Sequence, residues 1–254
     1  MITKLPNVLG IGVQKGGTTW LHWQLKKHNQ IFVPEAKEQH FFDNRSLAPD
    51  DVEKYKTAFR EAHEDYIAEV TPGYFWSSCY KDSEYDINPH RYDTPKRVKA
   101  LLGQDVKLIL LLRNPTDRAI SAYLHHMKKG RLGPGDSILD VGKRFGIIHM
   151  GFYAEHLLKW FDSFPKENFF VGKYEDLGPG LLEGISSFLG VERFELTDNE
   201  MNVKYNVNYS YLKSNNGIIV DDSIVVSANE IEILDELYYP ENKKLNDLLG
   251  SKFY

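Results

Sequence analysis

The stretch Gly10-Ile11-Gly12-Val13-Gln14-Lys15-Gly16-Gly17-Thr18-Thr19-Trp20 decides the fold of this 254-residue chain. The apolar pair Val8-Leu9 precedes it and a mixed apolar run from Trp20 follows, so the pattern predicts a strand, a glycine-rich turn and the first turn of a helix. Glycines let backbone N–H groups approach an anion at a helix N-terminus. The stretch therefore predicts a phosphate-binding loop.

This loop differs from a nucleoside-triphosphate P-loop at one position. Gly12, Gly17 and Thr19 have the spacing of that motif, which places a lysine directly after its last glycine. Here Thr18 follows Gly17, and the only lysine of the loop, Lys15, lies further back. The sequence therefore predicts an anion site that lacks the lysine with which a P-loop binds a triphosphate. The alternative is a glycine turn with no ligand. The predicted anion-binding residues are Lys15, Gly16, Gly17, Thr18, Thr19 and Trp20.

The composition is typical of a globular protein. The chain has 42% hydrophobic and 26% charged residues, enough to bury a full core, and its net charge of −5 argues against a general binder of nucleic acids or anionic membranes. One cysteine, Cys79, excludes an internal disulfide and suggests no metal site. Neither an apolar signal core nor a run of about 18 apolar residues occurs. We expect one soluble, cytoplasmic domain over residues 1–254, with no nucleic-acid or membrane partner.

Strand and helix patterns alternate along the chain. Apolar runs predict strands at residues 31–33, 66–70, 106–112 and 169–171 in addition to the first. The run 106–112 is almost wholly apolar, as in a central parallel strand covered on both faces. The alternation predicts an α/β fold, a P-loop-like doubly wound parallel sheet of about five strands with helices on both faces.

The segments between these strands are predicted as helices and loops. Residues 35–43 read as a polar loop, 77–92 as a surface excursion, and 195–220 have no clear assignment. The first predicted helix follows the glycine-rich loop and ends near residue 29. The other predicted helices span 51–62, 94–103, 115–129, 137–145, 151–164, 181–189 and 227–249, the last interrupted by Pro240.

Chemically active side chains follow three of the predicted strands, where ligands gather in such sheets. After the first comes the loop with Lys15. After the second come Glu38 and His40, a carboxylate and an imidazole able to flank one reacting hydroxyl. After the central strand comes Arg113, with Ser121 just over two helical turns further on.

Arg113 could form a two-pronged contact with a phosphate, to which Ser121 could add a hydrogen bond. The alternatives are a surface ion pair of Arg113 with Asp117 or Glu69, and an ordinary helix serine. A second phosphate clamp, apart from the loop at Lys15, predicts a nucleotide phosphorylated at both ends rather than a triphosphate.

Four separated motifs resemble, in order, the landmarks of the sulfotransferases, most closely the heparan sulfate N- and 3-O-sulfotransferase domains. The likeness covers roughly residues 8–189, and residues 239–245 resemble the family's terminal helix. The motifs are Gln14-Lys15-Gly16-Gly17-Thr18-Thr19, Lys37-Glu38-Gln39-His40-Phe41-Phe42-Asp43, Arg113-Asn114-Pro115 with Arg118-Ala119-Ile120-Ser121-Ala122-Tyr123, and Gly151-Phe152-Tyr153 ahead of Trp160.

The resemblance implies a donor, 3'-phosphoadenosine 5'-phosphosulfate (PAPS), and its product, 3',5'-adenosine bisphosphate (PAP). The 5'-phosphosulfate would lie in the loop 15–19, and the 3'-phosphate would meet Arg113 and Ser121. In the implied reaction a hydroxyl or amine attacks sulfur while PAP leaves. Lys15 would stabilise the growing negative charge in place of a metal ion, so no metal is expected.

The resemblance also assigns residues near the acceptor. Glu38 matches the family's catalytic base, and His40 and Asp43 match residues beside the acceptor. His125 matches an active-site histidine of the N-sulfotransferase domain, with an exposed helix histidine as the alternative.

The chain departs from the 3-O-sulfotransferases at two places. Val70 stands where those enzymes have a lysine, and their cysteine-bridged hairpin and basic loop over the donor have no clear counterpart after Leu189, although Lys213 could substitute. The acceptor is therefore open, and a carbohydrate or small molecule is suggested by resemblance alone. A P-loop kinase, disfavoured by Thr18, and a catalytically silent nucleotide-binding module, disfavoured by Glu38, are the competing functions.

Overall fold

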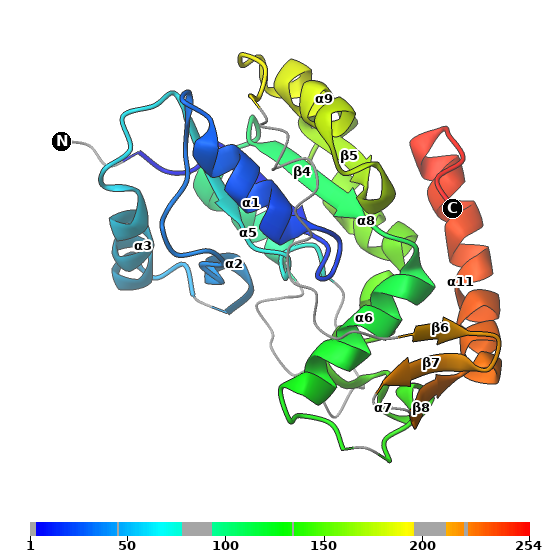
Figure 1. Ribbon diagram of the computed structural model, residues 1–254. Helices are drawn as coiled ribbons and strands as arrows, with labels where there is room; N and C mark the ends of the chain where they lie inside the picture. Colours follow the sequence, from blue (N-terminus) through cyan, green and yellow to red (C-terminus); the bar gives the residue numbers. More distant parts are fainter. Residues whose placement is uncertain (1–3, 45, 78–92, 134, 196–211, 221–222) are drawn as a thin grey trace.

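A parallel β-sheet forms the centre of the computed structural model, which describes residues 4–44, 46–77, 93–133, 135–195, 212–220 and 223–254. Its five strands are all paired in parallel, and helices cover both faces (Figure 1). The order is β2-β3-β1-β4-β5, with β1 (Val8–Gly12), β2 (Ile31–Phe32), β3 (Tyr66–Val70), β4 (Lys107–Leu112) and β5 (Phe169–Lys173). The predicted fold class is confirmed.

The two faces of the sheet bury separate apolar layers because side chains alternate along a strand. In β4, Leu108, Leu110 and Leu112 belong to one buried cluster, which also holds Trp160 of α8 (Tyr153–Phe161). Ile109 and Leu111 belong to another, shared with α1 (Thr18–Lys27) and α9 (Pro179–Leu189). A strand covered on both sides is apolar over its buried length, as Leu108 to Leu112 are in β4.

The segment predicted as a polar loop at 35–43 ends in a short helix, α2 (Phe41–Asn44). Phe41 stacks on Tyr55 of α3 (Pro49–Lys56), with ring centroids 4.2 Å apart. These tertiary contacts stabilise the helical turn, which local sequence does not predict. The helices α5 (Thr94–Leu102) and α6 (Pro115–Lys128) lie close to their predicted bounds.

The helix predicted at 137–145 is shorter and broken. It consists of α7 (Ile138–Val141) and a 3₁₀ turn at Arg144–Gly146, in which Phe145 and Gly146 have positive φ angles of 55° and 67°. The fully buried Arg118 donates hydrogen bonds to the carbonyls of Gly146 and Ile147, so this turn is held from α6.

The C-terminal region contains a small antiparallel sheet that the sequence did not predict. Its strands β6 (Leu212–Ser214), β7 (Gly217–Val220) and β8 (Ser223–Ser227) lie beside α6 and α11 (Ala228–Leu249), as Figure 1 shows. A hairpin thus does occur after Leu189, but the single cysteine of the chain excludes the cysteine-bridged form, so the expectation about a family counterpart stays a prediction. Cys79, most of the segment 77–92 and residues 196–211 lie outside the described residues.

The interruption of the last helix at Pro240 was also predicted wrongly. Helix α11 runs continuously through Pro240. Proline has no N–H, so the carbonyl group one turn earlier has no hydrogen-bond partner within the helix. Because Pro240 is exposed, this carbonyl lies on the solvent side of the helix. On the opposite face Tyr238 is buried and donates a hydrogen bond to Ile148 O at 2.6 Å, which fastens α11 to the rest of the molecule.

Candidate active site

The loops that follow β1, β2, β3 and β4 meet at one edge of the sheet, because parallel strands all end there and β1 lies between β3 and β4. Arg113 Nη1, after β4, donates to the carbonyl of Lys15, after β1, at 3.4 Å. Gly73, after β3, packs against Asp43, which follows β2. The positive charge of Lys37, after β2, also acts on Lys15, so the structure brings together the three sets of residues that the sequence singled out.

The loop after β1 has the backbone shape of an anion cradle. Lys15 and Gly17 have positive φ angles of 69° and 92°. A Cβ on Gly16 would lie 2.5 Å from the Leu111 carbonyl oxygen, so no larger residue fits there. Thr18 begins α1, for which the described residues provide neither a side-chain cap nor an acid in the first turn. The N–H groups and the dipole of this helix thus favour an anion.

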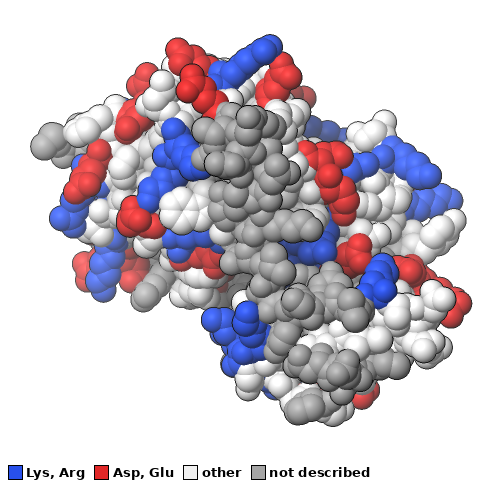
Figure 2. Space-filling model, viewed as in Figure 1, with Lys and Arg blue, Asp and Glu red and all other residues white. Residues whose placement is uncertain are grey.

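Positive charge converges on this cradle. Lys15 is half-buried, and burial, followed by the positive charges of Arg113, Lys37 and Lys128, lowers its pKa to about 8. The mutual repulsion of these cations would be relieved by a ligand that carries several negative charges. Figure 2 shows basic side chains gathered over the C-terminal end of α6, while acidic and basic side chains are interspersed elsewhere on that face.

Arg113 is oriented by its neighbours. Its guanidinium group lies over the ring of Tyr174, 4.5 Å from the centroid, and its carbonyl accepts a hydrogen bond from Tyr153 Oη at 2.7 Å. The two acids considered as alternative partners are engaged elsewhere: Glu69 is buried among hydroxyl groups and Asp117 pairs with Lys213 at 3.7 Å. Its Nη1 hydrogen bond to Lys15 O places the guanidinium at the cradle, where contact with a phosphate stays a prediction.

The loop after β2 joins Glu38, His40 and Asp43 into one hydrogen-bonded set. His40 Nδ1 lies 3.1 Å from Asp43 Oδ2, and His40 Nε2 lies 3.5 Å from Glu38 Oε2. Lys37 also pairs with Glu38. Glu38 and His40 have positive φ angles of 64° and 51°, unfavourable for residues with a side chain, so the surrounding contacts must impose this shape.

These contacts set the charges of both groups. Burial disfavours the ionised form of Glu38, but the hydrogen bond to His40 and the charge of Lys37 outweigh it and lower its pKa to about 2. Hydrogen bonds with Asp43 and Glu38 raise the pKa of His40 to about 9. At neutral pH Glu38 is therefore ionised, and His40 is a cation held between the side chains of Glu38 and Asp43.

The remaining predicted residues are placed as follows. Thr18 and Trp20 are buried in α1, and Ser121 is half-buried on α6, where its contact with a phosphate stays a prediction. His125 is half-buried on α6 rather than exposed. Lys213, on β6, reaches Asp117 in the first turn of α6, so it lies at the end of that helix next to Arg113.

Two residues of the site were missed by sequence reasoning, whereas Lys37 belongs to the motif already quoted and pairs with Glu38. Tyr174 directly follows β5, and its position beyond a strand end was the available signal. Lys128 has no local signal, because only the packing of α6 beside the cradle brings its charge close to Lys15.

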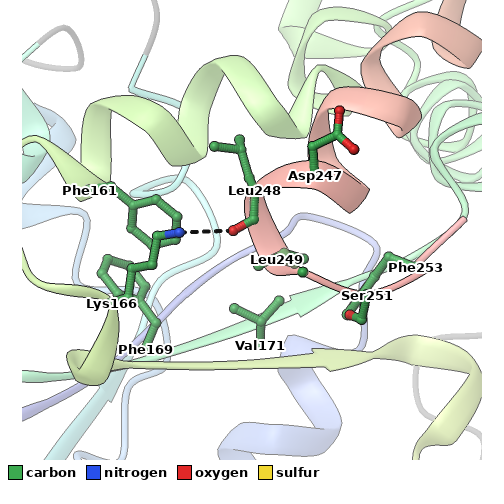
Figure 3. A pocket seen from close by; sticks show the side chains of 10 residues that line it. Phe161, Lys166, Phe169, Val171, Asp247, Leu248, Leu249, Ser251 and Phe253 are labelled. Atoms are coloured by element: carbon green, nitrogen blue, oxygen red, sulfur yellow. Dashed lines mark hydrogen bonds between the residues drawn. The ribbon is translucent and has the colours of Figure 1, made fainter.

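A hollow of about 430 Å³ lies apart from this edge, between β5 and the end of α11 (Figure 3). Phe161, Phe169 and Phe253 line it, and Lys166 crosses its mouth to donate a hydrogen bond to Leu248 O at 3.0 Å. None of the predicted site residues lines this hollow.

The described residues contain no cluster of three or more His, Cys, Asp or Glu side chains arranged to hold a metal ion. They also contain no helix with the length and apolar character needed to cross a bilayer.

The fold and the site define a P-loop-like α/β protein with an anion cradle, a second cationic clamp and a carboxylate–imidazole loop. The family model described as "Sulfotransferase domain" matches residues 5–218. The chain belongs to the sulfotransferase domain family.

Curated relatives and solved structures agree with this. The chain is 27% identical over 183 residues to heparan sulfate glucosamine 3-O-sulfotransferase 5 of Mus musculus, covering 67% of this chain and 48% of that protein. It is 27% identical over 273 residues to heparan sulfate glucosamine 3-O-sulfotransferase 6 of Homo sapiens, covering 98% of this chain and 73% of that protein. The chain thus spans about half to three quarters of the length of these relatives.

A sulfotransferase from Alicyclobacillus acidocaldarius has the same fold. Its crystal structure superposes with a TM-score of 0.70 at 21% sequence identity, covering 98% of both chains.

Proposed function

We propose that this protein transfers a sulfuryl group from PAPS to a hydroxyl or amine acceptor. One observation carries the proposal: an anion cradle at Lys15, a clamp at Arg113 and the carboxylate of Glu38 lie at the same edge of the sheet, after β1, β4 and β2. A donor with phosphate groups at both ends matches two cationic positions, and an ionised carboxylate beside them matches proton removal from an acceptor.

Each residue has a defined task in this proposal. The donor, when bound, supplies an activated sulfuryl group and an anionic leaving group. Glu38 takes the proton of the attacking hydroxyl or amine as its bond to sulfur forms and the bond from sulfur to the phosphate oxygen breaks. Lys15 and the N–H groups of the cradle stabilise the charge left on that phosphate. Arg113 and Ser121 hold the other phosphate, and His40 orients Glu38.

The acceptor class is proposed from the relatives. The two relatives named above are heparan sulfate glucosamine 3-O-sulfotransferases, so a sugar hydroxyl is the first acceptor to test. Val70 stands where the resemblance places a lysine, which favours an acceptor with less negative charge at that point. We further propose that this chain acts in the cytoplasm, as its single cysteine led us to expect, and without a metal ion, because Lys15 supplies the positive charge.

The first experiment measures ligand binding by calorimetry. PAP and ATP are titrated separately, each with and without Mg²⁺. The proposal expects PAP to bind without Mg²⁺ and more tightly than ATP. Tighter binding of ATP that depends on Mg²⁺ would instead indicate a kinase.

The second experiment measures turnover. PAPS labelled in the sulfuryl group is supplied with a panel of acceptors that includes a glucosaminyl oligosaccharide, a simple amine and a phenol. Transfer of label to any of them supports the enzyme, whereas PAP binding without transfer to any acceptor, and without slow hydrolysis of PAPS, would indicate a silent binding module.

A further inference from the structure

The turn that follows β3, residues 71–74, packs directly against His40 and Asp43. A Cβ atom added to Gly73 would lie 2.5 Å from Asp43 Oδ2 and 3.6 Å from His40 Cε1. The same turn is fixed to β1, because Thr71 N donates to Gly10 O at 3.0 Å. The His40–Asp43 pair is therefore supported by a segment that is itself anchored in the sheet.

Tyr74, in this turn, also reaches the backbone beside His40. Its hydroxyl accepts a hydrogen bond from the Phe41 N–H at 3.0 Å. Phe41 is the first residue of α2, and the first N–H groups of a helix have no partner within it. Because Tyr74 is fully buried, loss of its hydroxyl would leave this N–H unpaired and away from water.

Glu69 determines the direction in which the Tyr74 hydroxyl points. The Tyr74 O–H donates to Glu69 Oε1 at 2.6 Å, so the proton is committed to the carboxyl group and a lone pair is left for the Phe41 N–H. Glu69 is fully buried on β3, and it also accepts hydrogen bonds from Thr71 Oγ1 at 2.8 Å and from Tyr55 Oη. A carboxyl group with this many donors has one orientation.

We propose that Tyr74 is a positioning residue for the reaction: held by Glu69, it fixes the first turn of α2 and thereby the geometry of the His40–Asp43 pair next to Glu38. The effect on turnover rests on the proposed function, while the effect on His40 does not. Nothing in the family resemblance assigned a task to Tyr74 or Glu69.

The chain offers a matched pair of variants. Tyr74→Phe and Tyr55→Phe each remove one hydroxyl donor from Glu69 and keep a buried ring. Only the Tyr74 hydroxyl also accepts from Phe41. Both variants therefore lose a buried hydrogen bond to Glu69, and only Tyr74→Phe also loses the hydrogen bond to the first turn of α2. A difference between the two variants reports the effect of that second hydrogen bond.

The first measurement does not depend on turnover. The pKa of His40 is determined in the full chain by recording the NMR signals of its imidazole ring as a function of pH. The wild-type pKa of His40 is raised to about 9, with the Asp43 hydrogen bond as the first cause. In Tyr74→Phe this contact loosens, so the pKa of His40 should fall by about one unit or more toward its ordinary value. Tyr55→Phe should leave it within a few tenths of the wild-type value.

The second measurement is steady-state kinetics with the best acceptor. Tyr74→Phe should lower kcat about tenfold through misplacement of the loop, with PAP affinity unchanged, and Tyr55→Phe should stay within about twofold of wild type. Equal His40 titrations and equal kcat values in the two folded variants would overturn the proposal.

A further variant covers the case in which Tyr74→Phe does not fold. Gly73→Ala introduces a methyl group against Asp43 Oδ2 and leaves every buried hydroxyl in place, so it should also lower the pKa of His40. An unchanged His40 pKa in folded Gly73→Ala would show that the turn does not position the pair. Should the wild-type protein transfer no sulfuryl group, the proposed function fails, yet the two His40 titrations still decide the inference.

Discussion

Lys15 couples ligand binding to protonation at the scale of one residue. Its pKa is lowered to about 8 in the free protein by burial and neighbouring cations, and a bound polyanion would raise it again. Between these two pKa values binding must take up a proton, so PAP affinity should fall as the pH rises above about 8. Calorimetry at pH 8 in two buffers of different ionisation enthalpy should show uptake of about half a proton.

The control for this prediction is Lys4, which precedes β1 at the opposite edge of the sheet and pairs with Asp65. Lys4→Met should keep the proton uptake, and Lys15→Met should lose it. Identical heats in both buffers with the wild-type protein would mean that Lys15 does not meet the anion.

Arg113 should contribute to affinity rather than to the fold. Arg113→Ala is expected to weaken PAP binding by about 1.5–3 kcal/mol, the usual worth of hydrogen bonds to a charged group. The exposed Arg193, which pairs with Glu183, provides the control variant Arg193→Ala. Calorimetric affinities that match between the two folded variants would remove Arg113 from the donor site.

Glu38 should govern turnover rather than donor affinity. Glu38→Gln keeps the size of the side chain but cannot take a proton, so kcat should fall by about 10²–10⁴-fold while PAP binds as before. His40→Ala should cost less, because His40 is a cation at neutral pH and orients Glu38. Glu35→Gln, in the same loop and paired with Lys26, is the control. Near-normal turnover in Glu38→Gln together with none in His40→Ala would exchange the two roles.

At the scale of the element, the start of α11 illustrates a helix signal that can be read locally. Ser227 and Glu230 form a capping box: the Glu230 N–H donates to Ser227 Oγ at 3.2 Å, and the Ser227 N–H donates to Glu230 Oε2 at 2.8 Å. Ser227→Ala should therefore lower the free energy of unfolding by about 1 kcal/mol. Denaturant unfolding should show a smaller change for Ser187→Ala, in the interior of α9, and equal losses would contradict the cap.

The strands of the main sheet could be predicted because each is a short apolar run bounded by polar or glycine residues. The positions of the site loops could be predicted from these strands, because the carboxyl ends of parallel strands lie at the same edge of the sheet. The pairing of Glu38 with His40 was readable from a spacing of two residues. These features depend on local sequence plus topology.

Other features depend on contacts between distant residues and could not be predicted locally. The short helix α2 depends on Phe41 stacking against Tyr55, and the turn at Phe145 depends on hydrogen bonds from Arg118. The continuous path of α11 through Pro240 depends on which side of the helix faces solvent. In each case the local sequence favours one conformation, and contacts with distant residues stabilise a different one.

At the scale of the whole molecule, Gly151 shows how α11 is docked. This glycine belongs to a motif of the family resemblance, and the structure gives a packing reason for it: an added Cβ would lie 2.7 Å from the ring of Tyr238. Gly151→Ala should lower stability by about 1–3 kcal/mol through overpacking between α11 and the body of the protein. Gly180→Ala, with open space around its Cβ, is the control, and equal melting temperatures would contradict the docking role.

The strand order also has a consequence for how this chain is made. β1 is almost wholly apolar and central, yet Val8 pairs with Ala68 on one side and with Lys107 on the other. At a synthesis rate of about 5–20 residues per second, about 5–20 s separate the emergence of Val8 from that of its second partner. The strand that precedes the anion cradle is thus synthesised early, but its pairing with both neighbouring strands is completed only later. Premature association with other nascent chains during that interval is the hazard that this topology places on the cell.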